Sequence, residues 1–288
     1  MTPEEKTAAG YLPDRLADAV YRTVHTGKMP IAEIRLRRDG PLSLTMGTEQ
    51  KNYLCGVICT ADELTETAQR LCGGSLYAHA ETIREGVIVT AEGLRAGIAG
   101  RAVIRAGRME SVHELSSVSI RIPHRVKGAG DALGAVVRQY GSTLLASPPG
   151  MGKTTALREL IPLLAGGENA LRLAVIDTRY ELGAGMERSL LADFYSGWLR
   201  AEGMAAAIRT MTPECILCDE IADAADCAAI RTAAASGVMV VASAHASSMD
   251  TLCRNAEIRK LLEDGIFGCV CGMSFGKLTV WQCRGEGS

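Results

Sequence analysis

The sequence predicts an α/β protein with two domains, of which the second holds a parallel sheet. Beyond residue 131, apolar runs show no polar alternation, and each is followed by a segment with helical periodicity. Such runs are typical of strands that are covered on both faces. Pro123, Gly128 and Gly130 mark a joint before this region. With 288 residues, 47% of them apolar, the chain is long enough to bury two cores.

The first domain, residues 1–127, is predicted to be a small α+β unit. Apolar spacing predicts a helix over Leu12–His25, and Thr60-Ala-Asp-Glu63 has the capping-box pattern that opens a helix running to Cys72. A shorter helix is expected over Ser75–Arg84. The expected strands are Ile31–Leu36, Leu42–Met46, Val87–Thr90, Ala96–Ala106 and Val118–Ile122.

The second domain, residues 128–288, is predicted to alternate strands and helices. Its expected strands, all in one parallel sheet, are Thr143–Ala146, Leu171–Ile176, Cys215–Cys218, Val238–Ser243 and Leu278–Gln282. Its expected helices are Thr154–Ala165, Ala201–Met211 and Ala222–Ser236. In a sheet of this kind, ligands bind beyond the carboxyl ends of the strands, so the motifs at those ends are the first candidates for a site.

Charge and hydropathy argue against two classes of partner. The net charge is −2, and three Phe in the whole chain offer few stacking platforms, so nucleic acid is not expected as a partner. No run approaches the roughly 18 apolar residues of a membrane span. The opening residues, Met1–Lys6, lack the basic and apolar regions of a signal peptide. We therefore expect a cytoplasmic protein that reaches a membrane only through a partner.

The chain has ten cysteines, and four of them lie in strand-like apolar runs: Cys215, Cys218, Cys269 and Cys271. This placement predicts reduced, buried thiols. Cys215 and Cys218 form a C-x-x-C pair, but residues three apart on a strand point to opposite faces and cannot bind one metal ion. We expect no zinc site there.

The segment from Ser147 to Thr154, Ser-Pro-Pro-Gly-Met-Gly-Lys-Thr, follows a predicted strand and opens a predicted helix. This context is that of a phosphate-binding P-loop, whose backbone N–H groups surround the phosphates of ATP. Lys153 would reach the β- and γ-phosphates, and the Thr154 hydroxyl would bind Mg²⁺. The predicted nucleotide-binding residues are Ser147, Pro148, Pro149, Gly150, Met151, Gly152, Lys153, Thr154 and Thr155. The second domain is therefore predicted to be a RecA-like P-loop ATPase domain.

Ser147 stands where the P-loop pattern has glycine. If that position requires a positive φ, serine would be strained there by roughly 1–3 kcal/mol.

An apolar run ends in two carboxylates at Asp219 and Glu220. Asp219 would hold Mg²⁺ through water, and Glu220 would polarise the water that attacks the γ-phosphate. Asp-Glu at the end of a strand is common, and it is the P-loop earlier in the chain that favours a catalytic role over a structural one.

Two further strand ends are candidates for the same site. Val238–Ser243 leads into His245, which is either a γ-phosphate sensor or a structural histidine. The segment Asp177-Thr-Arg-Tyr-Glu181 follows another strand, and its carboxylates either orient water or metal or belong to a solvated loop.

The loops of the predicted site offer no certain arginine for the γ-phosphate. Arg209 lies on the helix before the Asp-Glu strand, where it would either act on a neighbouring subunit's nucleotide or form a local salt bridge. Arg179 and Arg200 are the other candidates for contact across a subunit interface.

These motifs resemble the stage III sporulation protein AA family, ATPases of endospore-forming bacteria. The resemblance spans nearly the whole chain and is densest at Ile120–Pro123, Pro148–Thr155, Ala201–Met204, Ile208–Glu214, Cys218–Ile221 and Ala244–Ala246. The family is similar to the motor ATPases of secretion and pilus systems, which form hexameric rings. The resemblance implies an ATP- and Mg²⁺-dependent motor on the mother-cell side, peripheral to membrane-embedded channel proteins that join mother cell and forespore.

The chain departs from the family pattern at Ser147, at Asp177–Glu181 and at Trp198–Arg200. The first two touch the nucleotide site and bear on turnover rather than binding. Three hypotheses remain open at this point: a motor ATPase, a nucleotide-gated scaffold of the same complex that hydrolyses little, and a nucleic-acid-stimulated RecA-like ATPase.

Overall fold

The structure is a computed structural model that describes residues 1–25, 29–47, 51–75, 79–90, 92–105, 107–124, 126–183, 186 and 189–283. The chain forms two compact units, Met1–His124 and Arg125–Ser288, which divide close to the predicted joint. Parts of two predicted elements, residues 76–78 of the short helix and Ala106 of a strand, lie outside the described residues.

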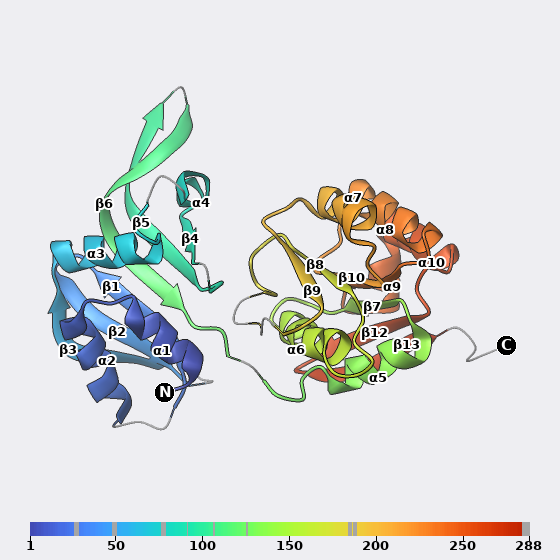
Figure 1. Cartoon of the computed structure of the whole chain (residues 1–288), viewed down its shortest axis with the longest axis horizontal. Helices are drawn as coiled ribbons and strands as arrows, with labels where there is room; N and C mark the ends of the chain where they lie inside the picture. Colours follow the sequence, from blue (N-terminus) through green and yellow to red (C-terminus); the bar gives the residue numbers. More distant parts are fainter. Residues whose placement is uncertain are drawn as a thin grey trace. The chain divides into compact units, whose positions relative to one another are not determined.

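The N-terminal unit is built on a six-stranded antiparallel sheet with the order β3-β2-β1-β6-β5-β4 (Figure 1). Its strands are β1 (Ile31–Arg37), β2 (Gly40–Met46), β3 (Lys51–Cys59), β4 (Val87–Val89), β5 (Arg95–Arg105) and β6 (Arg108–Arg121). Its helices are α1 (Pro3–Gly10), α2 (Asp14–His25), α3 (Ala61–Leu71) and α4 (Ala80–Arg84). One hydrophobic cluster joins the first three helices to the sheet.

Several elements of this unit differ from prediction, among them β6, which begins at Arg108 and not at the predicted Val118. The helix expected from Leu12 begins at Asp14, because the Pro13 carbonyl accepts the first helical hydrogen bonds, and a separate α1 precedes it. Strand β3 was not predicted. Gly56 in its middle has a φ of +72°, and the pairing with β2 is irregular, so the apolar residues do not alternate cleanly.

The C-terminal unit is built on a seven-stranded sheet with the order β13-β12-β7-β11-β10-β8-β9. Its strands are β7 (Thr143–Ala146), β8 (Leu173–Asp177), β9 (Ala192–Ser196), β10 (Cys215–Cys218), β11 (Met239–Ala244), β12 (Cys269–Ser274) and β13 (Lys277–Cys283). Its helices are α5 (Asp131–Tyr140), α6 (Lys153–Ala165), α7 (Arg200–Met211), α8 (Ala224–Ala235), α9 (Met249–Cys253) and α10 (Ala256–Glu263).

Helices cover both faces of this sheet, with α5 and α6 on one side and α7, α8 and α10 on the other (Figure 1). The strands accordingly contribute to two hydrophobic clusters, one on each face, and consecutive residues alternate between them: Leu144 belongs to one cluster and Leu145 to the other. Cys215 and Cys218 likewise lie in different clusters. The unbroken apolar runs of the sequence reflect this burial on both faces.

The prediction that Leu278–Gln282 runs parallel to the other strands was wrong, because β13 is antiparallel to β12. Only Phe275 and Gly276 separate the two strands, and a parallel neighbour would need a crossover connection of a dozen residues or more. Strand β9 was not predicted, and β12 was anticipated only as a strand-like run around Cys269 and Cys271. The remaining strands of this sheet lie within a few residues of their predicted positions.

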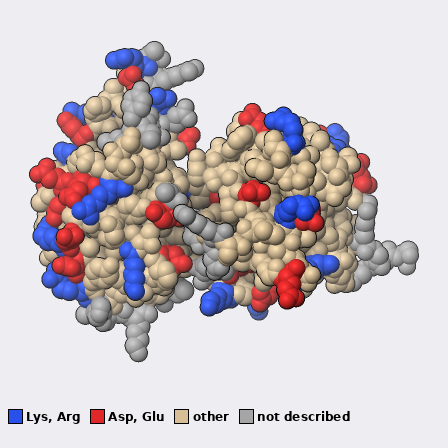
Figure 2. Space-filling model, in the orientation of Figure 1, with Lys and Arg blue, Asp and Glu red and all other residues tan. Residues whose placement is uncertain are grey.

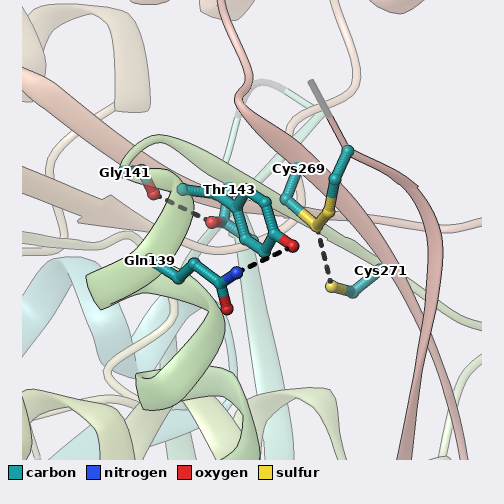
Figure 3. The surroundings of a disulfide bond; sticks show 7 residues. Gln139, Gly141, Thr143, Cys269 and Cys271 are labelled. Carbon is teal, nitrogen blue, oxygen red and sulfur yellow. Dashed lines mark hydrogen bonds between the residues drawn. A yellow bond between two sulfur atoms is a disulfide. The ribbon is translucent and has the colours of Figure 1, made fainter. Parts of the chain in front are cut away.

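The prediction of a reduced Cys269 was also wrong, because Cys269 forms a disulfide with Cys283 (Figure 3). The antiparallel register of β12 and β13 places these two residues directly opposite each other, with Cα atoms 4.2 Å apart. The Sγ atom of Cys271 lies 3.7 Å from that of Cys269. Burial raises the pKa of the Cys271 thiol to about 11.

Candidate nucleotide site

The segment that was predicted to bind phosphate connects β7 to α6 at the carboxyl edge of the sheet. Gly150 and Gly152 have φ values of +76° and +100°, a region that glycine enters without a steric penalty. Gly152 is also the N-cap of α6, so the loop ends where free backbone N–H groups and the helix dipole favour an anion.

Ser147 does not carry the predicted strain. The residues with positive φ in the described part of the chain do not include Ser147. Its N–H donates to the Ala244 carbonyl of β11 at 3.2 Å, and its hydroxyl donates to the Pro148 carbonyl at 2.9 Å. Serine at this position is buried and continues the β7–β11 pairing, because the left-handed turn begins only at Gly150.

Lys153 points back into the loop. Its Nζ donates to the Ser147 carbonyl at 2.8 Å and lies 3.1 Å from His245 Nδ1. The side chain is only 6% exposed, and this burial lowers the pKa of the ammonium group, while the nearby Glu220 carboxylate opposes that shift. A buried cation at the mouth of a phosphate loop is the arrangement needed to bind the β- and γ-phosphates.

His245 follows the end of β11 and connects the lysine to a carboxylate. Its Nε2 lies 2.9 Å from Glu220 Oε1. Because an ammonium group can only donate, Nδ1 must accept from Lys153, and Nε2 therefore carries the hydrogen that is donated to Glu220. Lys153, His245 and Glu220 thus form one hydrogen-bonded line across the ends of three strands.

Glu220 follows β10 in a left-handed conformation, with a φ of +45°. Its N–H donates to the Ser243 hydroxyl of β11 at 3.0 Å, which anchors this unusual backbone. The carboxylate accepts from His245 and forms an ion pair with Arg179. It is held by two side chains from different loops, in a position to accept a proton from a bound water molecule.

Asp219 is the most informative buried group of the site. It is 2% exposed, and its Oδ1 has no hydrogen-bond partner in the part of the chain that the structure describes. Burial raises the pKa of its carboxyl to about 6, and Asp177 and Glu181 add to the shift while Arg200 opposes it. An orphaned carboxylate oxygen fits a Mg²⁺ ion, which prefers oxygen ligands and would supply the missing positive charge.

A pocket of about 740 Å³ opens over these groups. Eight of the residues predicted to bind nucleotide or to act in catalysis line it, namely Pro149, Gly150, Gly152, Lys153, Thr154, Thr155, Glu220 and His245. Ser147, Pro148, Met151, Asp219 and Arg209 are not among its lining residues. The remaining wall consists of Arg179, Arg200, Ile221, Ala222, Thr251, Leu252, Asn255 and Ile258.

The α9–α10 part of this wall was not predicted. Asn255 caps α10 by accepting from the N–H groups of Glu257 and Ile258, and its Nδ2 donates to the Ala222 carbonyl at 3.0 Å. An asparagine before a helical run is a recognisable start signal in the sequence. Its link to Ala222, 33 positions earlier, is a tertiary contact that no local pattern contains.

Asp177 organises its own loop. Its Oδ1 accepts from the Glu181 N–H at 2.7 Å, and its Oδ2 accepts from the N–H groups of Leu182 and Gly183 at 3.0 and 2.9 Å. Asp177 is buried and therefore does not belong to a solvated loop, which was one of the two roles considered for this segment, and both of its carboxylate oxygens accept from backbone N–H groups.

The three candidate arginines occupy different positions. Arg179 and Arg200 line the pocket, where Arg179 pairs with Glu220 and Arg200 pairs with Asp226 at 2.8 Å. Both arginines are engaged by carboxylates of their own chain, so which arginine would contact a γ-phosphate stays a prediction. Arg209 is exposed on α7, outside the pocket, and forms no hydrogen bond or salt bridge within the described residues.

The strand order and the loop between β7 and α6 are those of a RecA-like P-loop ATPase fold. Solved structures with this fold include the DotB ATPase of Legionella pneumophila, with a TM-score of 0.58 and 15% identity over 93% of this chain and 78% of that chain. They also include the pilus retraction motor PilT with bound ADP, with a TM-score of 0.60 and 14% identity over 88% of this chain and 76% of that chain.

The chain belongs to the family described as sporulation stage III, protein AA, whose model matches residues 13–275. Stage III sporulation protein AA of Bacillus subtilis is 30% identical over 271 residues, which cover 90% of this chain and 87% of that protein. Protein SEEDLING PLASTID DEVELOPMENT 1 of Arabidopsis thaliana is 29% identical over 175 residues, which cover 55% of this chain and only 25% of that protein.

The family and the fold confirm the resemblance and the fold class that the sequence predicted. They support a sporulation-related, ATPase-like protein. Within the described residues, the structure contains no helix with the length and hydropathy needed to cross a membrane.

Proposed function

We propose that this protein binds ATP and Mg²⁺ and hydrolyses the β–γ phosphoanhydride bond. The observation that carries the proposal is the hydrogen-bonded line Lys153–His245–Glu220 in the pocket beside the phosphate loop. It combines a cation for the phosphates with a carboxylate for the attacking water.

Each residue of the site has a defined task in this reaction. The N–H groups of the loop and Lys153 bind the phosphates, and Thr154 and Asp219 would hold Mg²⁺, which neutralises phosphate charge when bound. Glu220 orients water and takes its proton. His245, placed between Lys153 and Glu220, reports the position of the γ-phosphate to the carboxylate through its two ring nitrogens.

We further propose that the protein acts as a motor subunit of a homo-oligomeric ring, expected to be a hexamer. Its partners would be membrane-embedded channel proteins of a sporulation complex, reached from the cytoplasm of the mother cell. Family membership supports the sporulation setting. The likeness of the fold to PilT, which is described as a pilus retraction motor, supports a mechanical role.

Turnover of ATP by the purified protein tests the proposal. Glu220→Gln keeps the size of the side chain but removes the base, so we expect hydrolysis to fall about 10²- to 10⁴-fold while ATP binding is retained. Glu214→Gln is the matched control. Glu214 directly precedes the first residue of β10, whereas Glu220 follows the last, and Glu214 pairs with Arg172 away from the pocket. Equal loss of binding and turnover in Glu220→Gln would assign Glu220 a structural role.

A second candidate function is a nucleotide-gated scaffold that hydrolyses little. The Arg179–Glu220 ion pair favours it, because the guanidinium group occupies the carboxylate that would otherwise contact the attacking water. Arg179→Ala separates the two functions: a rise in turnover supports the scaffold, and a fall supports a catalytic role for Arg179.

We do not propose a nucleic-acid-stimulated ATPase. Acidic and basic side chains are interspersed on the viewed face of the N-terminal unit (Figure 2), an arrangement that matches a phosphate backbone poorly.

A further inference from the structure

The turn between β12 and β13 has an unusual sequence for its geometry. Ser274 pairs with Lys277, so Phe275 and Gly276 form a two-residue hairpin loop. Their φ values are +48° and +75°, and a loop with both residues at positive φ is a type I′ turn. Asparagine, aspartate and glycine are favoured at its first position, whereas a bulky aromatic residue is a conformational outlier.

Phe275 is also exposed. Its side chain is 85% accessible, and it belongs to none of the hydrophobic clusters of the described chain. The backbone strain and the exposed ring are both unfavourable, and no packing within the described fold offsets them. Strained residues of this kind cluster at active sites and ligand-binding segments.

This turn lies directly against the phosphate loop. The Gly276 N–H donates to the Met151 carbonyl at 3.0 Å. A β-carbon added to Gly152 would lie 3.6 Å from the Gly276 Cα. The backbone of the turn that carries Phe275 is therefore held next to the loop that would surround the phosphates.

The strand order sets the direction in which a nucleotide would extend. Strand β7, which leads into the phosphate loop, lies between β11 and β12. The residues that would meet the γ-phosphate, His245 and Glu220, follow β11 and β10 on one side of the loop. With the γ-phosphate on that side, the ribose and the base extend toward the other side, where the β12–β13 turn lies.

We propose that Phe275 is the stacking platform for the nucleobase of the bound nucleoside triphosphate. This inference rests on the proposed function and adds to it a binding residue outside the phosphate loop. Bases stack on aromatic rings through faces that every base has, so the platform would favour a nucleotide over free polyphosphate without selecting one base.

The pocket offers a competing position for the base, beside Thr251, Leu252 and Asn255. That part of the pocket is joined to Ala222, on the β10 side of the loop. A nucleobase at that position would require the triphosphate to bind in the opposite direction along the loop, with its γ-phosphate pointing away from Glu220. Among the described lining residues the only aromatic ring is that of His245, which is already engaged by Lys153 and Glu220.

Calorimetric titration of the 288-residue chain with Mg²⁺-ATP and with Mg²⁺-tripolyphosphate tests the platform. Phe275→Asn removes the ring and introduces a residue that suits the turn, so the melting temperature should not fall. We expect it to weaken ATP binding about 5- to 100-fold and to leave tripolyphosphate binding unchanged. Phe275→Trp should retain wild-type affinity for ATP. Val280→Ala, on the same hairpin and also exposed, should change neither affinity.

The outcomes separate this inference from the function on which it rests. Wild-type affinity for ATP in Phe275→Asn would overturn the platform while leaving the ATPase intact. Equal weakening of ATP and tripolyphosphate would also overturn it, because the turn would then act by supporting the phosphate loop. Absence of ATP binding by the wild-type chain would overturn both.

Discussion

The two units of the chain each bury a carboxylate that is 2% exposed, and the two carboxylates differ in what surrounds them. Glu5 in the N-terminal unit accepts from the N–H groups of Thr2 and Ile31, both at 2.8 Å, so its charge completes a capping box and anchors a strand. Asp219 in the C-terminal unit has an Oδ1 without a partner among the described residues. The satisfied carboxylate is part of the scaffold, whereas the unsatisfied one indicates a site.

The sheets explain why the site is in the second unit. In an antiparallel sheet, neighbouring strands end at opposite edges, so polar residues that follow strands are dispersed. In the C-terminal unit, β7, β8, β10, β11 and β12 are parallel, and the residues that follow them meet at one edge. The phosphate loop, Glu220, His245 and the Phe275 turn all lie at that edge because of this topology.

The largest effect that we expect concerns the arginine that completes the site. If neighbouring subunits supply Arg209, Arg209→Ala should lower turnover by about 10³- to 10⁵-fold, and activity per subunit should rise with protein concentration. Mixing Arg209→Ala with Lys153→Ala chains should restore part of the activity. Such mixing pairs an intact phosphate loop with an intact arginine across one interface.

Arg138→Ala, an exposed arginine on α5, is the control for this experiment. The same mixing should be tried with Arg179→Ala and Arg200→Ala, whose side chains already line the pocket of their own chain. Activity that is independent of concentration, with no rescue in any of the three mutants, would show a self-sufficient monomer and contradict the ring.

The next largest effect concerns Lys153. Lys153→Ala removes a charge-assisted contact to the phosphates, so the affinity for ATP should fall about 10- to 100-fold, equivalent to roughly 1.5–3 kcal/mol. Lys260→Ala, an exposed lysine on α10, is the matched control. Circular dichroism should show an unchanged fold. Wild-type affinity in Lys153→Ala would contradict the assignment of the phosphate loop.

The smallest effects that we expect are changes in the free energy of unfolding when either of the two buried carboxylates, Glu5 or Asp219, is replaced. Glu5→Ala should destabilise the N-terminal unit by about 1–3 kcal/mol, because it leaves two N–H groups without their acceptor. Asp219→Asn should instead stabilise the C-terminal unit at pH 7.5 in EDTA by about 1–3 kcal/mol. Denaturant unfolding of the two variants and the wild type measures both effects.

The sign for Asp219 follows from its pKa. Burial raises the pKa in the folded state to about 6, above the value near 3.8 of an exposed aspartate. The folded state therefore holds its proton more tightly, and stability falls as the pH rises from about 4 through 6. Asparagine does not ionise and should remove this loss. A destabilised Asp219→Asn in EDTA would show that the carboxylate has a structural role like that of Glu5.

Local pattern was sufficient for the elements whose signals are contiguous. The phosphate loop was predicted because a strand, two glycines, Lys-Thr and a helix follow one another within the span from Thr143 to Ala165. Strand β10 and its two terminal carboxylates were predicted for the same reason. Strand β3 escaped prediction because Gly56 interrupts its alternation, and the direction of β13 was wrong because a short loop was not recognised as a hairpin turn.

The sequence by itself determined the class of fold, the family and the position of the loop that we propose binds phosphate, since each depends on residues that are adjacent in the chain. Only the tertiary structure decided which distant side chains meet. Lys153 and His245 are separated by 92 positions yet lie 3.1 Å apart, and Cys269 faces Cys283 because two strands run antiparallel. It also decided that Ser147 is unstrained and that Oδ1 of Asp219 has no hydrogen-bond partner among the described residues. Backbone angles and burial depend on packing against segments far away in the chain, and no local pattern records them.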